Sequence, residues 1–328
     1  MPESASHFSH GQQGSTAHEI ERVATPVLFL IFNRPELTKR SFAAIRHARP
    51  KKLYVAADGP RRDRAGEAEK AEAARQIATS VDWGCDVRCL FRDDNLGCQK
   101  AVSEAITWMF ETEQQGIILE DDCVADPSFF RFCDEMLERY AEQPEVGVVT
   151  GNNFQRGIRR GDASYYFSKY NHCWGWATWN RAWEKFDYSM RDCSASIATS
   201  VIDRFATAKG EQRHWKRTFR NVRRGKINSW AFRWTYSCWS NQLLTITPAV
   251  NLVENIGFGD DATHTKETPG LQLPKRQSIA FPLIHPTKVA QCADADEFTT
   301  RKHFKIDSSL IAKTHRLIVD TKKHLNRK

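Results

Sequence analysis

Hydrophobic residues in the first half of the chain form short apolar runs separated by longer amphipathic or polar segments. The runs at 27–32, 53–57, 116–119 and 146–150 carry no charge, and residues 86–91 alternate between polar and apolar positions. Short continuous apolar runs are typical of strands that are buried on both faces of a sheet. The segments between them, at 35–45, 61–80, 95–109 and 126–137, have helical spacing or helix-forming composition. We therefore predict an α/β fold with a layered sheet.

The pattern changes after residue 150. Residues 165–190 are dense in Tyr and Trp, residues 211–226 are basic, and residues 242–256 predict short strands. We interpret residues 151–265 as the half that completes a site over the sheet. Residues 1–24 lack an apolar block and are predicted to be a disordered leader. Residues 266–328 are predicted to be a C-terminal extension that ends in a basic amphipathic helix from Asp307.

Composition narrows the range of partners and compartments. The 328 residues carry a net charge of +8, which suits a polyanion, an anionic membrane surface or a phosphate-bearing substrate. The nine cysteines are scattered without the paired spacing of a zinc ribbon, which indicates reduced thiols. No apolar run approaches the about 20 residues of a membrane span. We expect a cytoplasmic protein, with peripheral contact at the inner membrane left open.

An acidic triplet, Glu120-Asp121-Asp122, directly follows one of the apolar runs. Ligands of open α/β sheets bind at the carboxyl ends of the strands. Adjacent carboxylates repel one another, and a divalent cation such as Mg²⁺ or Mn²⁺ would neutralise them and bridge to substrate phosphates. Alternation along an extended strand end would place Glu120 and Asp122 on one side and Asp121 on the other. The alternative is a solvated acidic loop that caps the following helix.

Other polar loops favour the ligand-binding interpretation. Asn33-Arg34, Asp58-Gly59 and the segment from Arg92 through Asn95 to Gly97 also follow predicted strands. The carboxyl ends of parallel strands meet at one edge of a sheet, so these loops should converge on the triplet.

Two stretches resemble a known family. Residues 118–122 followed by Asp126-Pro127-Ser128-Phe129-Phe130 are similar to the segment of the N-acetylglucosaminyltransferase I family in which a Glu-Asp-Asp triplet carries the metal. The run from Asn251 to Thr265 resembles a group of bacterial sugar transferases. The resemblance covers residues 25–265 and implies the GT-A fold, a Rossmann-like mixed sheet flanked by helices. It also implies a nucleotide-sugar-binding half at 25–150 and an acceptor half at 151–265.

The resemblance implies roles for individual residues. Asp122 would be the direct metal ligand, and His264 would complete the metal or diphosphate site. Glu120 and Asp121 would meet the ribose and metal-bound water. The remaining residues expected to bind the donor are Asn33, Arg34, Asp58, Arg92, Asn95, Lys100, Trp174, Gly175 and Trp176.

Three of these assignments have alternatives. His264 could be a loop histidine that caps a turn. Lys100 could equally be a solvated helix lysine. Trp174, Trp176, Trp179 and Trp183 could form a platform for a sugar ring, but their spacing also fits one face of a helix that packs in the core.

The general base departs from the family pattern. In the family an acidic residue follows the Trp of the segment that here spans residues 229–234, and this chain has Ala231 at that position. Three explanations remain: an inactivating substitution, another carboxylate such as Glu254, Asp260 or Asp261, or a shifted register.

The sequence therefore predicts a metal-dependent, inverting glycosyltransferase. It would use Mn²⁺ or Mg²⁺ to move a sugar, with N-acetylglucosamine as the favoured case, from a UDP-sugar to a hydroxyl of a glycan or lipid-linked acceptor. Homodimer formation is left open, and no nucleic acid is expected. One alternative is a sugar nucleotidyltransferase, which the absence of glycine from Asn33-Arg34-Pro35 disfavours. The other is a non-enzymatic nucleic-acid-binding protein that uses the basic residues 211–226.

Overall fold

One mixed sheet of eight strands organises the fold, as seen in a computed structural model that describes residues 22–191, 193, 202–206, 208–258 and 273–306. Its strands, in spatial order, are β3 (Asp86–Phe91), β2 (Lys52–Ala57), β1 (Val27–Ile31), β4 (Gln115–Glu120), β8 (Trp176–Trp179), β6 (Val146–Thr150), β9 (Leu244–Pro248) and β7 (Tyr165–Ser168). The first four are parallel, and β8 runs antiparallel to both of its neighbours. A separate pair joins β5 (Cys123–Ala125) to β10 (Val253–Asn255).

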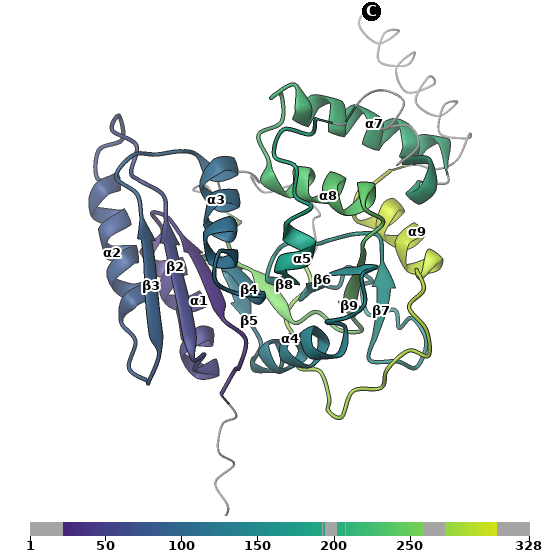
Figure 1. Ribbon diagram of the computed structural model, residues 1–328, viewed down its shortest axis with the longest axis horizontal. Helices are drawn as coiled ribbons and strands as arrows, with labels where there is room; N and C mark the ends of the chain where they lie inside the picture. The colour runs from purple at the N-terminus through teal and green to yellow at the C-terminus, as the bar shows by residue number, and fades with distance from the viewer. Residues whose placement is uncertain (1–21, 192, 194–201, 207, 259–272, 307–328) are drawn as a thin grey trace, which may run out of the picture.

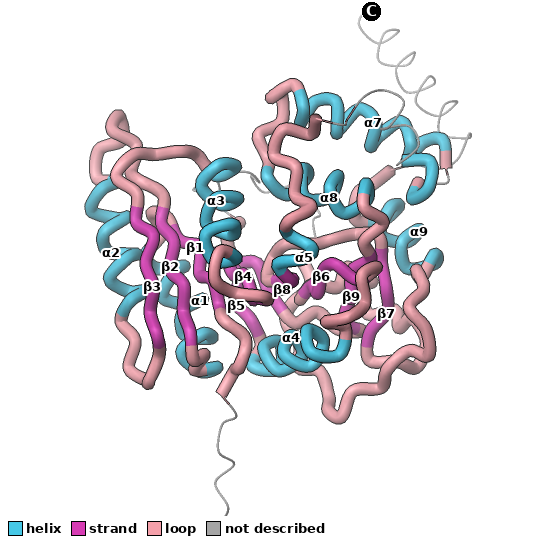
Figure 2. The backbone as a smooth tube through the Cα atoms, viewed as in Figure 1, coloured by secondary structure: helices cyan, strands magenta, loops and turns pink. Residues whose placement is uncertain are grey.

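Helices cover both faces of the sheet (Figures 1 and 2). They are α1 (Pro35–Ala48), α2 (Glu67–Thr79), α3 (Cys98–Phe110), α4 (Pro127–Arg139), α5 (Asn180–Trp183), α7 (Lys209–Arg223), α8 (Trp230–Ser240) and α9 (Ala293–Lys302). The chain is thus an α/β protein with a large mixed sheet, as the sequence predicted.

Alternate residues of the central strands feed two separate cores. Val27 and Phe29 of β1 lie in the core that includes residues of α1, α2 and α4, whereas Leu28 and Leu30 lie in the core that includes residues of α3, α5, α7 and α8. The continuous apolar runs are therefore buried on both faces, which confirms that prediction. The start of α4 is also confirmed, because Asp126 caps the helix by accepting from the Ser128 N–H at 3.0 Å, with Pro127 at its first position.

The helix predicted from the tryptophan spacing is wrong over most of its length. Trp176 and Trp179 lie on strand β8, and only Asn180–Trp183 is helical. β8 is an interior strand whose two faces are both covered, so Trp176 enters one core and Trp179 the other. Trp176, Trp179 and Trp183 are 1%, 3% and 4% exposed, which confirms the alternative that these side chains pack in the core.

Ordered residues are found inside the predicted leader and inside the predicted C-terminal extension. Val23 is buried and its N–H donates to the Ala48 carbonyl at 3.3 Å, so ordered packing begins inside the predicted leader. Residues 273–306 pack on the body of the protein, where α9 lies against β7 and Gln291 bridges to Phe167. The rest of the predicted leader and the helix predicted from Asp307 lie outside the described residues. Within the described part, no helix is long and apolar enough to cross a bilayer.

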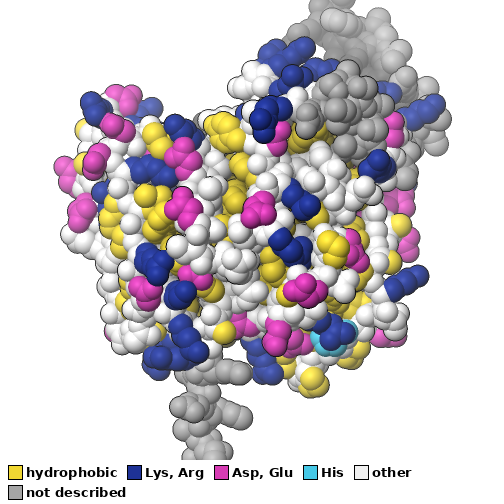
Figure 3. Space-filling model, in the orientation of Figure 1, with side chains coloured by type: hydrophobic (Ala, Val, Ile, Leu, Met, Phe, Trp, Pro, Cys, Tyr) yellow, Lys and Arg dark blue, Asp and Glu magenta, His cyan; other side chains and the backbone are white. Residues whose placement is uncertain are grey.

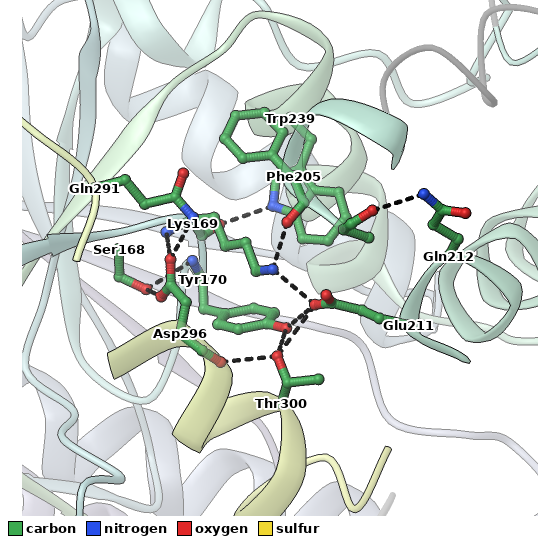
Figure 4. Close-up of polar contacts among 11 residues, drawn as sticks. Ser168, Lys169, Tyr170, Phe205, Glu211, Gln212, Trp239, Gln291, Asp296 and Thr300 are labelled. Carbon is green, nitrogen blue, oxygen red and sulfur yellow. Dashed lines mark hydrogen bonds and ion pairs between the residues drawn. The ribbon is translucent and has the colours of Figure 1, made fainter. Parts of the chain in front are cut away.

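A buried ionic network ties the last segments to the sheet (Figure 4). The Lys169 ammonium, just after β7, lies 2.7 Å from the Glu211 carboxylate on α7, and both side chains are 5% exposed. Glu211 also accepts from the Tyr170 hydroxyl at 2.6 Å and from the Thr300 hydroxyl of α9 at 3.1 Å. Asp296 of α9 accepts from Ser168 at 2.5 Å. The Glu211 carboxylate therefore joins three segments that are distant in the chain: residues 169–170, α7 and α9.

Removal of the Lys169 ammonium should make the protein less stable against unfolding. Lys169→Met should lower the free energy of unfolding by about 3–5 kcal/mol, because Glu211 would then be a buried charge without its counterion. Urea denaturation would measure the loss. The matched control is Lys52→Met, since Lys52 pairs with Glu113 but its side chain is 42% exposed. The control should cost about 0–1 kcal/mol. Equal losses for the two variants would show that the network contributes nothing specific.

Candidate functional site

A cavity of about 350 Å³ lies at the carboxyl ends of β1, β2 and β4, beside the start of α3. This volume is within the range of about 300–1,000 Å³ that is typical of small-molecule and cofactor sites. The predicted site residues that line it are Arg34, Asp58, Arg92, Asn95, Glu120, Asp121, Asp122 and Trp174. The polar loops therefore converge on the acidic triplet as expected.

Other predicted residues lie away from the cavity lining or outside the described residues. Those that are described but do not line it are Asn33, Lys100, Gly175, Trp176, Ala231 and Glu254. Asp260, Asp261 and His264 lie outside the described residues. Asn33 is turned toward the start of α2, where its amide donates to Glu67 at 2.8 Å. Lys100 pairs with Glu104 at 3.7 Å and is half exposed, which matches the solvated-lysine alternative.

Arg34 joins two of the three acids. Its guanidinium donates to Asp121 in a very short contact and to Asp122 at 3.1 Å. The Asp121 carboxylate also accepts from the Phe32 N–H at 3.3 Å. The predicted alternation of side chains is therefore wrong, because β4 ends at Glu120 and the chain turns there. The turn brings the carboxylates of Asp121 and Asp122 to the same group, the Arg34 guanidinium.

The acids carry more negative charge than one guanidinium can balance. Burial, followed by repulsion from Asp122 and Asp121, raises the pKa of Glu120 to about 8. Burial also raises the pKa of Asp121 to about 6, although Arg34 opposes the shift. Carboxylates that are reluctant to ionise are a site where a bound cation would be strongly favoured.

The end of β10 closes around Asp122. The Asn255 amide donates to its carboxylate at 3.0 Å, and the Ile256 N–H donates to its carbonyl at 2.8 Å. A Cβ on Gly257 would lie 2.1 Å from the Asp122 Oδ2, so only glycine fits there. Asn255, Gly257 and Phe258 line the cavity but were not among the predicted residues. The signal was present, because they belong to the run that resembles sugar transferases.

Asp58 organises the loop between β3 and α3. Its carboxylate accepts from the Asn95 amide at 3.1 Å and from the N–H groups of Leu96 and Gly97, both at 2.9 Å. Gly59 allows the close approach of this loop, since a Cβ there would lie 2.4 Å from the Asp94 carbonyl carbon. Asp58 therefore lines the cavity mainly as the residue that fixes the opposite wall.

Two further arginines line the cavity. Arg61, which was not predicted, is held by Glu67 through hydrogen bonds that include one of 3.0 Å from its Nε. The same contacts, with burial opposing them, lower the pKa of Glu67 to about 2. Arg92 lies 3.4 Å from Glu104. The signal for Arg61 was its place one residue beyond the turn Asp58-Gly59-Pro60. Both guanidinium groups are placed where they could meet an anionic ligand.

The aromatic segment divides between site and core. Trp174 lines the cavity and packs edge-on against Phe258, with ring centroids 5.5 Å apart. Trp176 instead stacks on Trp230 in the core. Gly175 has a positive φ of 74°, and a Cβ there would lie 2.7 Å from a Val253 methyl. Glycine is therefore required at 175 for packing against β10.

The expected base position lies beside the cavity and not in its lining. Ala231 is in the first turn of α8, where it is partly buried against the core. Asn228, three residues earlier, does line the cavity. Glu254 lies on β10, opposite Val124 of β5.

No group of three or more His, Cys, Asp or Glu side chains among the described residues is arranged to enclose a metal ion by itself. Such an enclosure is not needed for Mg²⁺ and similar cations, which usually keep several waters and take one or two carboxylates together with substrate phosphates. Asp122 and its neighbours fit that less demanding arrangement. Comparison of the sequence with models of known protein families found no match, and comparison with curated proteins found none either.

Glu120 should make the metal-free protein less stable as the pH rises. A carboxyl whose folded pKa is raised from 4.5 to about 8 resists ionisation in the fold, so stability falls with rising pH across that window. Glu120→Gln cannot ionise and should therefore raise the Tm in the absence of divalent cations, by more at about pH 8 than at about pH 5.

Thermal unfolding with a chelator present would measure the difference in Tm between Glu120→Gln and the parent at each of the two pH values. Glu69→Gln on the exposed side of α2 makes the same chemical change away from the cavity and should leave Tm unaltered. A Tm gain for Glu120→Gln that does not grow with pH would contradict the burial argument.

Proposed function

We propose that the chain is a GT-A-type, metal-dependent glycosyltransferase that uses a UDP-sugar, with UDP-N-acetylglucosamine as the favoured donor. The observation that carries the proposal is the acidic triplet in the wall of a cavity that Arg61 and Arg92 also line. Carboxylates suit a divalent cation, and guanidinium groups suit phosphate oxygens. A nucleoside diphosphate with its metal combines both requirements. The acceptor would be a hydroxyl of a glycan or lipid-linked glycoconjugate.

Asp122 is the residue proposed to hold Mn²⁺ or Mg²⁺, with Glu120 and Asp121 beside it. When bound, the cation would stabilise the negative charge that develops on the leaving nucleoside diphosphate. Arg34 fixes the directions of the Asp121 and Asp122 carboxylates through three hydrogen bonds, two to Asp121 and one to Asp122. Asn255 fixes the Asp122 carboxylate from the other side. The orientation of the ligand is therefore set before any donor arrives, which supports efficient binding.

The remaining walls would orient the donor. Asp58 holds the loop that places Asn95 in the cavity lining. Trp174 and Phe258 form an apolar wall, which would exclude water from the sugar and so limit hydrolysis of the donor. The acceptor hydroxyl would attack the anomeric carbon from the side opposite the diphosphate, with inversion. Its proton would pass to a carboxylate.

The binding of a uridine nucleotide tests the proposal directly. UDP with Mn²⁺ should raise the Tm, with stabilisation of about 2.7 kcal/mol at about a hundredfold excess over Kd. Asp122→Asn should abolish the Mn²⁺-dependent part of the shift. Asp162→Asn removes an exposed carboxylate away from the cavity and should bind as the parent does. No response to any uridine nucleotide would overturn the proposal.

Product analysis separates the proposal from a nucleotidyltransferase. A glycosyltransferase releases UDP from a UDP-sugar when an acceptor is present. A nucleotidyltransferase instead consumes UTP and a sugar phosphate and releases pyrophosphate. Detection of pyrophosphate without UDP release would favour the second activity.

Restoration of an acid at position 231 tests the identity of the base. Ala231→Asp should raise the transfer rate by about 10²–10⁴-fold if this position carries the base in the family. An aspartate in the first turn of α8 is favourable to the helix, so the variant should fold. The matched control is Ala231→Asn, because the asparagine side chain has the shape of aspartate but cannot accept the proton. An unchanged rate for Ala231→Asp would move the base to another carboxylate, such as Glu254, Asp260 or Asp261, and the amide variant of that residue should then lose activity.

A further inference from the structure

Six cations form a stripe along the outer face of α7. The cationic stripe consists of five residues of α7, Lys209, Arg213, Lys216, Arg217 and Arg220, together with Arg224 at its C-terminal cap. Their spacings of three, four and one residues repeat with the helical period, so the side chains share one face. All are exposed except Lys216, which is partly exposed.

The charge of the chain is concentrated here. Residues 203–226 contain nine Lys and Arg but only two acids, a net charge of +7 compared with +8 for the whole chain. Of the two acids, Glu211 is buried against Lys169 and Asp203 pairs with Lys216 at 3.5 Å. The other five members of the stripe have no carboxylate partner among the described residues. Figure 3 shows Lys and Arg side chains gathered over α7.

The inner face of α7 holds the helix in place without help from the stripe. Trp215, Phe219 and Val222 are at most 1% exposed. Glu211 anchors the same face to Lys169, Tyr170 and Thr300 (Figure 4). Like charges four residues apart along the stripe oppose helix formation. The stripe therefore works against the helix, and an anionic partner would relieve that repulsion.

We propose that the cationic stripe docks on the anionic lipid headgroups of a bilayer. The stripe is a straight row about 22 Å long on a helix at the periphery of the protein, which suits a planar array of phosphates (Figure 1). A nucleic acid is less well matched. Trp215 and Phe219 of α7 face the core, so neither is offered for stacking on bases. The Gln212 amide donates to the Ala206 carbonyl at 2.9 Å instead of being free to contact a base edge.

The stripe also leads toward the cavity. Arg224 is four residues before Asn228, which lines the cavity, and four residues span at most about 14 Å. A bilayer on α7 would therefore lie near the part of the cavity wall that Asn228 forms. This use of the surface, to present a lipid-linked acceptor, rests on the proposed function, whereas the docking itself does not.

Vesicle binding by the full chain tests the proposal. We expect the protein to co-sediment with vesicles of phosphatidylcholine that contain about one third phosphatidylglycerol, and not with phosphatidylcholine alone. Binding should weaken as salt rises, because the stripe is exposed and screened. Arg213→Gln/Arg217→Gln/Arg220→Gln should reduce the partition coefficient by about a hundredfold, at roughly fivefold for each cation lost.

The matched control removes equal charge elsewhere. Lys39→Gln/Arg40→Gln/Lys70→Gln lies on the exposed sides of α1 and α2 and should keep vesicle binding. Neither triple variant should have a lower Tm than the parent, since the stripe opposes the helix, and both should keep the parental UDP response. Loss of vesicle binding with an intact UDP response therefore separates the docking proposal from the proposed function. Equal vesicle binding by the two variants, or none by the parent chain, would overturn the proposal. Displacement from vesicles by a short RNA or DNA duplex at lower concentration than by soluble anionic lipid would assign the stripe to nucleic acid instead.

Discussion

The crowding of negative charge at the end of β4 is the constraint on which the candidate site depends. β4 pairs on both edges and ends at Glu120, and the chain turns over the next two residues. The turn sets three carboxylates at one sheet edge, where burial raises the pKa of Glu120 and Asp121. Arg34, in the loop between β1 and α1, offsets part of this negative charge. On the proposed function, a bound cation would offset the rest of the charge.

The other site features are arranged around this edge. Gly257 permits β10 to press on Asp122, and Gly59 permits the loop after β3 to close on Asp58. A side chain at either position would collide with the cavity wall that the glycine approaches. Arg61 and Arg92 are each held by an acid outside the triplet, so they remain directed at the cavity without neutralising it. The result is a cavity with carboxylates on one wall and two guanidinium groups on another.

In the second half of the chain, a buried ionic network attaches the peripheral helices α7 and α9 to the sheet. The Lys169–Glu211 pair costs desolvation energy, but the additional bonds from Tyr170 and Thr300 satisfy the buried carboxylate. The same glutamate fixes which face of α7 is inward. The opposite face is thereby left with its cations exposed, so the buried network and the cationic stripe are two consequences of one helix orientation.

The sequence by itself determined the layered α/β architecture, because uncharged runs such as residues 27–32 can be satisfied only by burial on both faces of a sheet. It also determined that Arg34, Asp58 and the triplet converge, since parallel strand ends share an edge. Only the tertiary structure decided which tryptophans enter the core, because the spacing of Trp176 and Trp179 fits a helix face and an interior strand equally well. It alone decided that Asn33 turns to Glu67 and that Gly257 contacts Asp122. Such contacts join residues far apart in the chain, and no local pattern records them.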